Sequence, residues 1–171
     1  MDDGRINACA FSPDGARILA VGGRNSVSIW DLASELRIAA LRGHEAEVLA
    51  CAFSPEGKEV LSAGRDANLY LWNSETGEML TVLRGHTGAV NSCGFSPDGR
   101  VAISGGDDKT LRLWDIRAGS QILGFKGFTG KITSCSFSPD DTQILAGDNR
   151  GLVLIFRIMS ASRANAEKIK S

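Results

Sequence analysis

The rare residues of this chain recur every 42 positions, and this period constrains the fold more than any other feature of the sequence. No insertion or deletion breaks the register. The residues that keep the step are Cys9, Cys51, Cys93 and Cys135; Pro13, Pro55, Pro97 and Pro139; and Trp30, Trp72 and Trp114, with Phe156 in the next place. A fixed period of this length indicates a repeat architecture of four units.

Each unit has the pattern of β-structure. In the third unit, the short apolar segment 90–95 is followed by Ser96-Pro97-Asp98-Gly99, with proline and glycine where a tight turn requires them. Further strand-like segments follow at about 100–104, 110–115 and 121–125. No window carries a convincing helical period. We therefore expect an all-β chain in which each unit is a four-stranded antiparallel meander.

Composition excludes several functional classes. The 171 residues include 19 basic and 20 acidic side chains, for a net charge of −1, so the basic footprint of a nucleic-acid-binding protein is missing. No apolar run approaches the ~18–20 residues that cross a bilayer. Four cysteines, one in each unit and expected to be free thiols, and the absence of an Asn-x-Ser/Thr sequon favour a reducing, intracellular compartment, which we take to be the cytoplasm.

Four dipeptides mark the units further. Gly43-His44 and Gly85-His86 precede the second and third units, and Trp30-Asp31 and Trp114-Asp115 lie within the first and third. Trp72-Asn73 and Phe156-Arg157 are degraded forms of the second dipeptide. With these motifs in phase over about residues 5–158, the chain resembles the WD-repeat β-propeller family.

The resemblance implies a partial (open) β-propeller of four blades with an incomplete last blade. Its four WD repeats would span about 5–44, 45–86, 87–128 and 129–158. The fourth strand of the last blade would fall near 163–167, which reads Arg-Ala-Asn-Ala-Glu, a poor strand. We therefore expect three strands there and a tail over 159–171 that is frayed or weakly helical.

The resemblance also implies a hydrogen-bond network inside the two inner repeats. An indole N–H donates, serine and histidine both donate and accept, and an ionised aspartate accepts, so every member can be satisfied. The residues in question are His44, Ser62, Asp66 and Trp72 in the second repeat and His86, Ser104, Asp108 and Trp114 in the third. The first and fourth repeats depart from this set, as terminal repeats commonly do.

Serine, histidine and aspartate together raise the question of catalysis. A hydrolase needs an exposed, activated serine, yet each serine lies within an expected strand, no G-x-S-x-G elbow exists and the set occurs twice. The two histidines lie in different repeats and lack a metal-ligand spacing. We therefore expect no enzyme activity, no metal and no cofactor, and we interpret the network as structural.

The resemblance indicates a protein-interaction scaffold that binds proteins or peptides. The family's usual docking face carries the loops before each first strand and those between the second and third strands. Because the signs there are mixed, the charge of the partner stays open. The candidate residues are Arg24, Asn25, Glu45, Glu47, Arg65, Asp107, Phe128, Lys131 and Arg150. Phe128 replaces the expected histidine, and we favour a packing role for it over a role as an aromatic anchor.

Two questions about the whole protein stay open. An open stack exposes an apolar face at each end. We expect the chain to be a fragment of a longer propeller, and the alternatives are pairing with itself or completion by another protein. The second functional hypothesis is a sensor or regulatory portion of a larger ATPase or kinase-like signalling protein, although no G-x-x-x-x-G-K-[ST] motif appears here.

Overall fold

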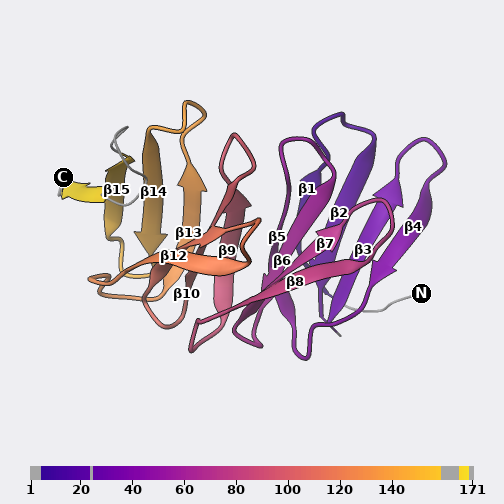
Figure 1. Cartoon of the computed structure of the whole chain (residues 1–171). Helices are drawn as coiled ribbons and strands as arrows, with labels where there is room; N and C mark the ends of the chain where they lie inside the picture. Colours follow the sequence, from indigo (N-terminus) through magenta and orange to yellow (C-terminus); the bar gives the residue numbers. More distant parts are fainter. Residues whose placement is uncertain (1–4, 24, 159–165, 170–171) are drawn as a thin grey trace.

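A computed structural model describes residues 5–23, 25–158 and 166–169, and these residues form four antiparallel sheets without a helix (Figure 1). Each of the four sheets, or blades, contains four strands that pair in chain order. The first two blades comprise β1 (Ile6–Phe11), β2 (Arg17–Gly22), β3 (Ser26–Asp31) and β4 (Leu36–Leu41), then β5 (Val48–Phe53), β6 (Glu59–Gly64), β7 (Asn68–Asn73) and β8 (Met79–Arg84).

The other two blades follow the same plan. They comprise β9 (Val90–Phe95), β10 (Val101–Gly106), β11 (Leu111–Asp115) and β12 (Ser120–Phe125), then β13 (Ile132–Phe137), β14 (Gln143–Asp148), β15 (Val153–Ile158) and β16 (Ala166–Ile169). The prediction of an open propeller built from four antiparallel meanders is confirmed.

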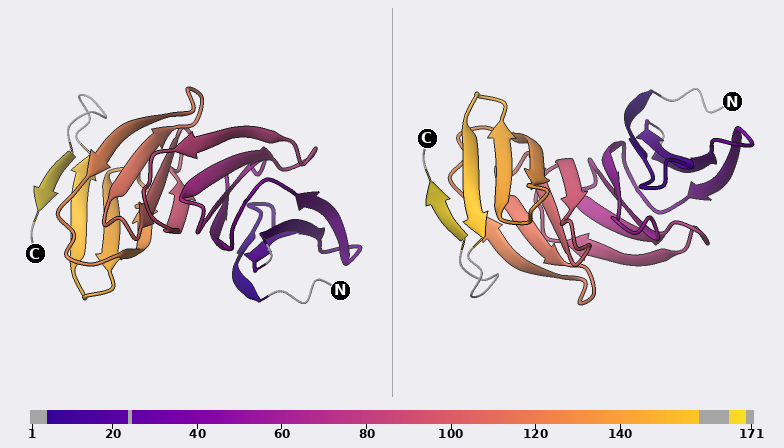
Figure 2. Two further views of the ribbon diagram at one scale, coloured as in Figure 1. Left: turned by 90° about the horizontal axis from the view of Figure 1, so that it is seen from below. Right: turned by 90° about the horizontal axis from the view of Figure 1, so that it is seen from above.

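The blades stand side by side in an arch, with blades 1 and 4 at its two ends (Figure 2). Their first strands form the inner row, because β1 contacts β5, β5 contacts β9 and β9 contacts β13. The second strand of each blade also contacts the first strand of the next, as in β2 with β5 and β10 with β13. The molecule therefore has one core between each pair of neighbouring blades.

The three cores follow from the period-2 alternation of the strands. Leu19 and Ile29 of blade 1 are fully buried against Val60 and Trp72 of blade 2. The same positions one unit later, such as Leu61, belong to the core between blades 2 and 3. Each blade thus presents one apolar face to the next blade and the opposite face to the previous one.

The 42-residue period also fixes the hairpin turns. Gly15, Gly57 and Gly99 occupy equivalent turn positions with φ between 70° and 72°, where an L side chain is strained. In the fourth unit the residue at this position is Asp141, which adopts φ 57°. Aspartate is one of the few residues that tolerate the left-handed region, so the fourth turn keeps its shape without glycine.

The structure corrects the prediction for the end of the chain. Residues 166–169, expected to be frayed or weakly helical, form β16, which pairs antiparallel with β15. The physical reason is that the open edge of β15 offers unpaired N–H and C=O groups to any chain segment that returns beside it. The last blade remains the least complete, since β16 has four residues where the other outer strands have six.

The pairing register of β16 explains why the 42-residue period did not predict the position of this strand. In blades 2 and 3, the equivalent pairs are Leu71 with Thr81 and Leu113 with Leu123. The equivalent partner of Ile155 would be residue 165, but Ile155 pairs with Ile169. The outer strand is therefore shifted by four residues, and the rest of the expected tail, 159–165 and 170–171, lies outside the described residues.

Candidate functional site

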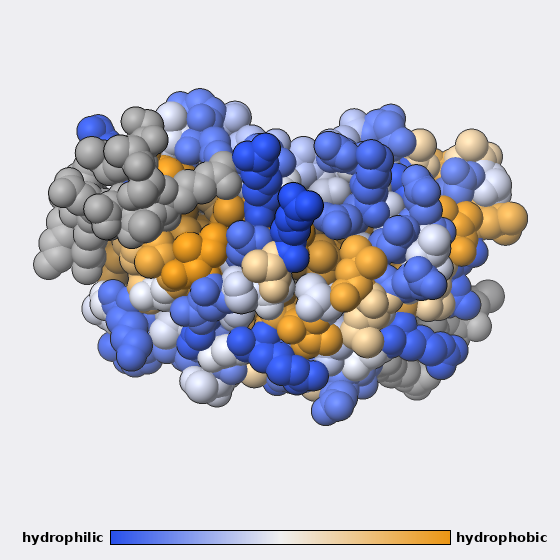
Figure 3. Space-filling model, viewed as in Figure 1, coloured by the Kyte–Doolittle hydropathy of each residue, from blue (hydrophilic) through white to orange (hydrophobic). Residues whose placement is uncertain are grey.

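The loops of the blades lie at two opposite ends of the strands. We call one of them the histidine-loop end. It carries the loops that enter blades 2, 3 and 4, at 42–47, 85–89 and 127–131, and the turns near 25, 65–67, 107–109 and 149–151. The opposite end, with the Ser-Pro turns at 12–16, 54–58, 96–100 and 138–142, is the proline-turn end. Strands β9 and β13 point toward the proline-turn end, at the top of Figure 1. Both edges are largely hydrophilic in the same view (Figure 3).

In blade 2 the structure joins the four residues of the expected network into one chain of hydrogen bonds. Trp72 Nε1 donates to Ser62 Oγ at 2.8 Å, and Ser62 Oγ lies 2.8 Å from His44 Nε2. His44 Nδ1 lies 2.7 Å from Asp66 Oδ2, which also accepts the backbone N–H of Glu45 at 3.1 Å. The network therefore ties β6 and β7 to the loop that enters the blade.

Blade 3 repeats the arrangement. Trp114 Nε1 donates to Ser104 Oγ at 2.8 Å, and Ser104 Oγ lies 2.7 Å from His86 Nε2. His86 Nδ1 lies 2.9 Å from Asp108 Oδ2. Thr110 adds a hydroxyl bond of 2.8 Å to the same carboxylate, so blade 3 holds its aspartate more firmly than blade 2 does.

The protonation and burial of the network residues favour a structural role over a catalytic one. Burial lowers the pKa of His44 and His86, against the opposing effect of Asp66 and Asp108, so both rings are neutral at pH 7. Ser62 and Ser104 are fully buried. No substrate can reach hydroxyl groups in this position, and each is already engaged by an indole and an imidazole.

Blade 4 replaces the polar network with an apolar one. Phe128, Ala146 and Phe156 stand where histidine, serine and tryptophan stand in blades 2 and 3, and all three are buried. The ring centroids of Phe128 and Phe156 lie 6.5 Å apart. Because all three polar partners are replaced together, none is left buried and unsatisfied. Phe128 is thus a core residue, in agreement with the packing role favoured for it, and it is removed from the candidate docking residues.

A different residue fixes the loops of blade 4. Asp148, at the position of Gly64 and Gly106, accepts the backbone N–H of Gly130 at 2.7 Å and of Arg150 at 2.9 Å, and a hydroxyl bond from Thr129 at 2.9 Å. Burial alone would raise the pKa of Asp148, but these hydrogen bonds outweigh it and bring the pKa to about 2. This anchor was not predicted from the sequence. Its signal is Asp148 itself, which stands where the other three units have Gly22, Gly64 and Gly106.

Two of the candidate docking residues form a clamp between blades 1 and 2. Glu47 accepts a hydrogen bond from Arg65 Nε at 2.7 Å and another from Asn7 Nδ2 at 3.0 Å. Asn7 also donates to the carbonyl of Val48 at 2.8 Å. The bonds from Arg65 and Asn7 lower the pKa of Glu47. The charge of Glu47 is therefore balanced within the protein.

A second clamp joins blades 3 and 4, but here the acidic residue belongs to the preceding blade. Asp107 accepts a hydrogen bond from Asn91 Nδ2 at 2.9 Å and forms an ion pair with Lys131 Nζ at 2.5 Å. Asn91 donates in turn to the carbonyl of Ile132 at 2.9 Å. Asn7 and Asn91 are 84 residues, or two periods, apart, so the clamps lie at the first and the third of the three blade interfaces. The other candidates, Asn25, Glu45 and Arg150, lie in the loops of this end, and Arg24 lies outside the described residues.

A row of basic residues at the histidine-loop end was also missed. Arg42, Arg84 and Lys126 are exposed and stand at equivalent positions, just before the loops that enter blades 2, 3 and 4. No ion pair joins them to another residue in the described part of the chain. The sequence does contain the signal, because Arg42, Arg84 and Lys126 are spaced by the same 42 residues as the cysteines and prolines.

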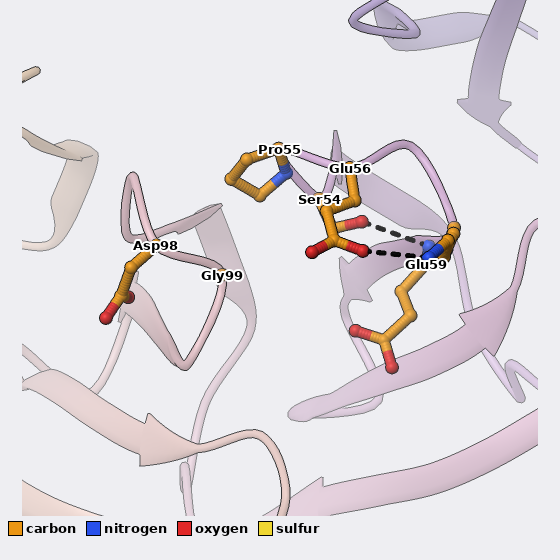
Figure 4. Close-up of a pocket in the computed structure, with 7 residues that line it drawn as sticks. Ser54, Pro55, Glu56, Glu59, Asp98 and Gly99 are labelled. Atoms are coloured by element: carbon orange, nitrogen blue, oxygen red, sulfur yellow. Dashed lines mark hydrogen bonds and ion pairs between the residues drawn. The ribbon is translucent and has the colours of Figure 1, made fainter.

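The proline-turn end carries a row of acidic residues, of which Glu56 pairs with Lys58 and Asp98 with Arg100. An exposed acidic residue occupies the same turn position in each blade, and the four are Asp14, Glu56, Asp98 and Asp140. Between blades 2 and 3 these turns border a pocket of about 220 Å³, with Asp98 and Gly99 on one side and Glu56 and Glu59 on the other (Figure 4). Burial and the neighbouring Glu56 raise the pKa of Glu59.

The equivalent space between blades 1 and 2 is occupied by a side chain of the protein. Arg17, at the position of Glu59, donates from Nη2 to the carbonyl of Gly57 at 2.9 Å and from Nη1 to Ser74 Oγ at 3.1 Å. Its guanidinium also lies 5.6 Å from the centre of the Phe53 ring. The pocket in Figure 4 remains open because the second unit has Glu59 where the first unit has Arg17.

The four cysteines have no partner sulfur and remain free thiols. Burial raises the pKa of Cys51 and Cys135 to about 12 and that of Cys93 well above its usual value. These three thiols are therefore protonated and unsuited to nucleophilic chemistry. Cys9 is exposed, because no blade covers that side of β1.

Within the described residues, no three histidine, cysteine, aspartate or glutamate side chains converge to form a metal-binding group. In the same part of the chain, no helix is long and apolar enough to cross a membrane.

The comparison with protein families decides the relationship. The WD domain, G-beta repeat family matches four consecutive segments, at residues 2–31, 36–73, 77–115 and 119–157. The chain belongs to this family. No curated protein matches the chain significantly. WD repeats generally mediate protein–protein interaction and are typically non-catalytic, in keeping with the closed networks of blades 2 and 3.

Proposed function

We propose that this WD-repeat protein is a non-catalytic scaffold whose histidine-loop end binds an acidic segment of a partner protein. The observation that carries the proposal is the row of Arg42, Arg84 and Lys126, one exposed basic residue at the same position of three consecutive blades. Glu47 and Asp107 are already paired with Arg65 and Lys131 in the two clamps, so these two carboxylates do not offset the basic row.

Rigid placement supports this role. The loops between the blades are held by the histidine networks in blades 2 and 3 and by Asp148 in blade 4. A partner would therefore meet preorganised charges and would not have to order the loops on binding. Charge complementarity of this kind mainly accelerates association and sets orientation, so the binding should weaken as salt is added.

The test is a charge reversal at each end of the blades, with a fluorescent poly-glutamate peptide as the probe. The triple variant Arg42→Glu, Arg84→Glu, Lys126→Glu should lower the affinity at least about tenfold in fluorescence anisotropy. The matched control is the triple variant Lys58→Glu, Arg100→Glu, Arg117→Glu at the proline-turn end, where Arg117 lies in the loop between β11 and β12. It changes the net charge by the same amount. It should leave the affinity within about twofold of the unmodified protein.

Equal losses in the two triple variants would show that only net charge matters and would contradict a docking site at the histidine-loop end. The proposal would also be wrong if the unmodified protein bound poly-lysine as well as it binds poly-glutamate. A preference for poly-lysine would move the docking site to the acidic proline-turn end.

A further inference from the structure

Three positions of each blade face the next blade, and their exposure changes abruptly at the end of the chain. In blades 1 to 3, the side chains at these positions are at most 6% exposed. They are Leu19, Val27 and Ile29; Leu61, Leu69 and Leu71; and Ile103, Leu111 and Leu113. In blade 4, the equivalent Leu145, Val153 and Ile155 are 45%, 49% and 37% exposed. We call these three residues the aliphatic end face.

The other end of the arch shows the complementary change. Trp72, Trp114 and Phe156 face the preceding blade and are at most 2% exposed. Trp30, at the same position in blade 1, is 39% exposed, and Phe11 and Cys9 on β1 are exposed as well. We call Trp30, Phe11 and Cys9 the tryptophan end face.

The blade interfaces inside the molecule show what each end face is shaped to meet. Leu19 and Ile29 of blade 1 pack in one cluster with Val60 and Trp72 of blade 2. Leu69 and Leu71 of blade 2 likewise pack in one cluster with Trp114 of blade 3. Every internal interface therefore joins an aliphatic face to a face that carries the large aromatic residue at the position of Trp30.

We propose that a second copy of this chain covers both end faces, with the aliphatic end face of each copy packed on the tryptophan end face of the other. The contact continues the repeating interface of blades 1 to 4. Two copies joined twice in this way would close a ring of eight blades with a two-fold axis. Each blade would then turn by about 45°, within the range of known propellers.

The proposal distinguishes unlike faces from like faces. Pairing of two tryptophan end faces would place Trp30 against Trp30, an arrangement that no internal interface of the molecule uses. A head-to-tail contact also keeps the histidine-loop ends of both copies on the same side of the ring. The contact between the end faces does not depend on the docking role of the loops.

The first experiment is light scattering after size-exclusion chromatography of the protein and of single variants. The unmodified protein should have twice the 18.1 kDa mass of one chain. Trp30→Asp and Leu145→Asp should each give the monomer, because each removes both contacts of a two-fold ring. The control Leu80→Asp, at an exposed leucine on the outer strand of blade 2, should remain a dimer. Circular dichroism establishes that each variant is folded.

Mixing the two monomeric variants separates head-to-tail contact from other modes of association. The Trp30→Asp chain keeps an intact aliphatic end face, and the Leu145→Asp chain keeps an intact tryptophan end face. Their equimolar mixture should form a dimer through one restored contact, whereas neither variant forms it alone. Alkylation of Cys9 provides a second readout, and its rate should fall several-fold as the dimer fraction rises, because the second copy covers this thiol.

The remaining outcomes overturn the proposal. A protein that stays monomeric at high concentration would show that the end faces are covered by something other than a second copy. A dimer that survives Leu145→Asp but not Trp30→Asp would show pairing of like faces. A ladder of larger assemblies would show that the contact does not close into a two-copy ring.

Discussion

At the scale of single residues, two buried histidines make the stability of the fold depend on pH in a defined direction. Burial lowers the pKa of His44 and His86 below the value of 6.5 that an exposed histidine has in the unfolded chain. Below pH 6.5 the unfolded chain therefore binds more protons than the folded one, until the folded pKa is reached. The free energy of unfolding should have its full value above about pH 6.5. It should decrease as the pH falls from 6.5 to the folded pKa, by up to about 2.7 kcal/mol per pH unit for the two histidines together.

Urea unfolding at several pH values between 7.5 and 5 measures this dependence. The variant His86→Ala removes one of the two titrating groups and should reduce the slope of stability against pH by about half. It should also cost about 1–3 kcal/mol at pH 7.5, because Ser104 and Asp108 lose a buried hydrogen-bond partner. A flat profile between pH 7.5 and 5 in the unmodified protein would show that the two rings are not buried in the neutral form.

The resemblance to WD repeats was enough to identify the members of these two networks. His86, Ser104, Asp108 and Trp114 lie in phase with their counterparts in blade 2, and their hydrogen bonds follow from which groups donate and which accept. Burial of Phe128 could also be foreseen, because its partners Ala146 and Phe156 had lost their polar atoms as well. A side chain without polar partners gains more from packing than from exposure.

At the scale of strands and loops, Asp148 has the part in blade 4 that the histidine networks have in blades 2 and 3. It accepts backbone N–H groups from the loop before β13 and from the turn after β14. The variant Asp148→Ala leaves these donors unpaired, so both loops should open more often. Limited trypsin digestion should then cleave faster after Lys131 and Arg150, the basic residues in these two loops.

The matched control is Asp140→Ala, in the Ser-Pro turn of the same blade, which leaves both loops of the histidine-loop end untouched. It should not change cleavage after Lys131 or Arg150. Unchanged digestion of Asp148→Ala at these two sites would contradict the anchoring role.

Strand boundaries followed from the period wherever the period held. The strand expected near 121–125 in the third unit corresponds to β12, and β8 and β4 lie one and two periods before it. The period could not place β16, because a four-residue shift in register separates Ile169 from its expected place beside Ile155. It also could not reveal the clamps of Asn7 and Asn91, since each amide binds residues about 40 positions later, in the next blade.

At the scale of the whole molecule, stability is distributed unevenly along the arch. Blades 2 and 3 pack on both faces, whereas blades 1 and 4 pack on one. In a stack where each repeat contacts only its neighbours, the end repeats should open at a lower free energy than the inner ones. We therefore expect the amides of β6 and β10 to exchange with deuterium at least about tenfold more slowly than those of β2 and β14.

Native-state hydrogen exchange of the Trp30→Asp variant tests this gradient, because a second copy would cover the end faces and remove it. The unmodified protein at high concentration should show a smaller difference between β2 and β6, if its blades 1 and 4 are packed on both faces as the inner blades are. Equal protection of all four second strands in the monomeric variant would contradict the gradient. It would show that the arch unfolds as one cooperative unit, and that the three inter-blade cores stabilise the end blades as fully as the inner ones.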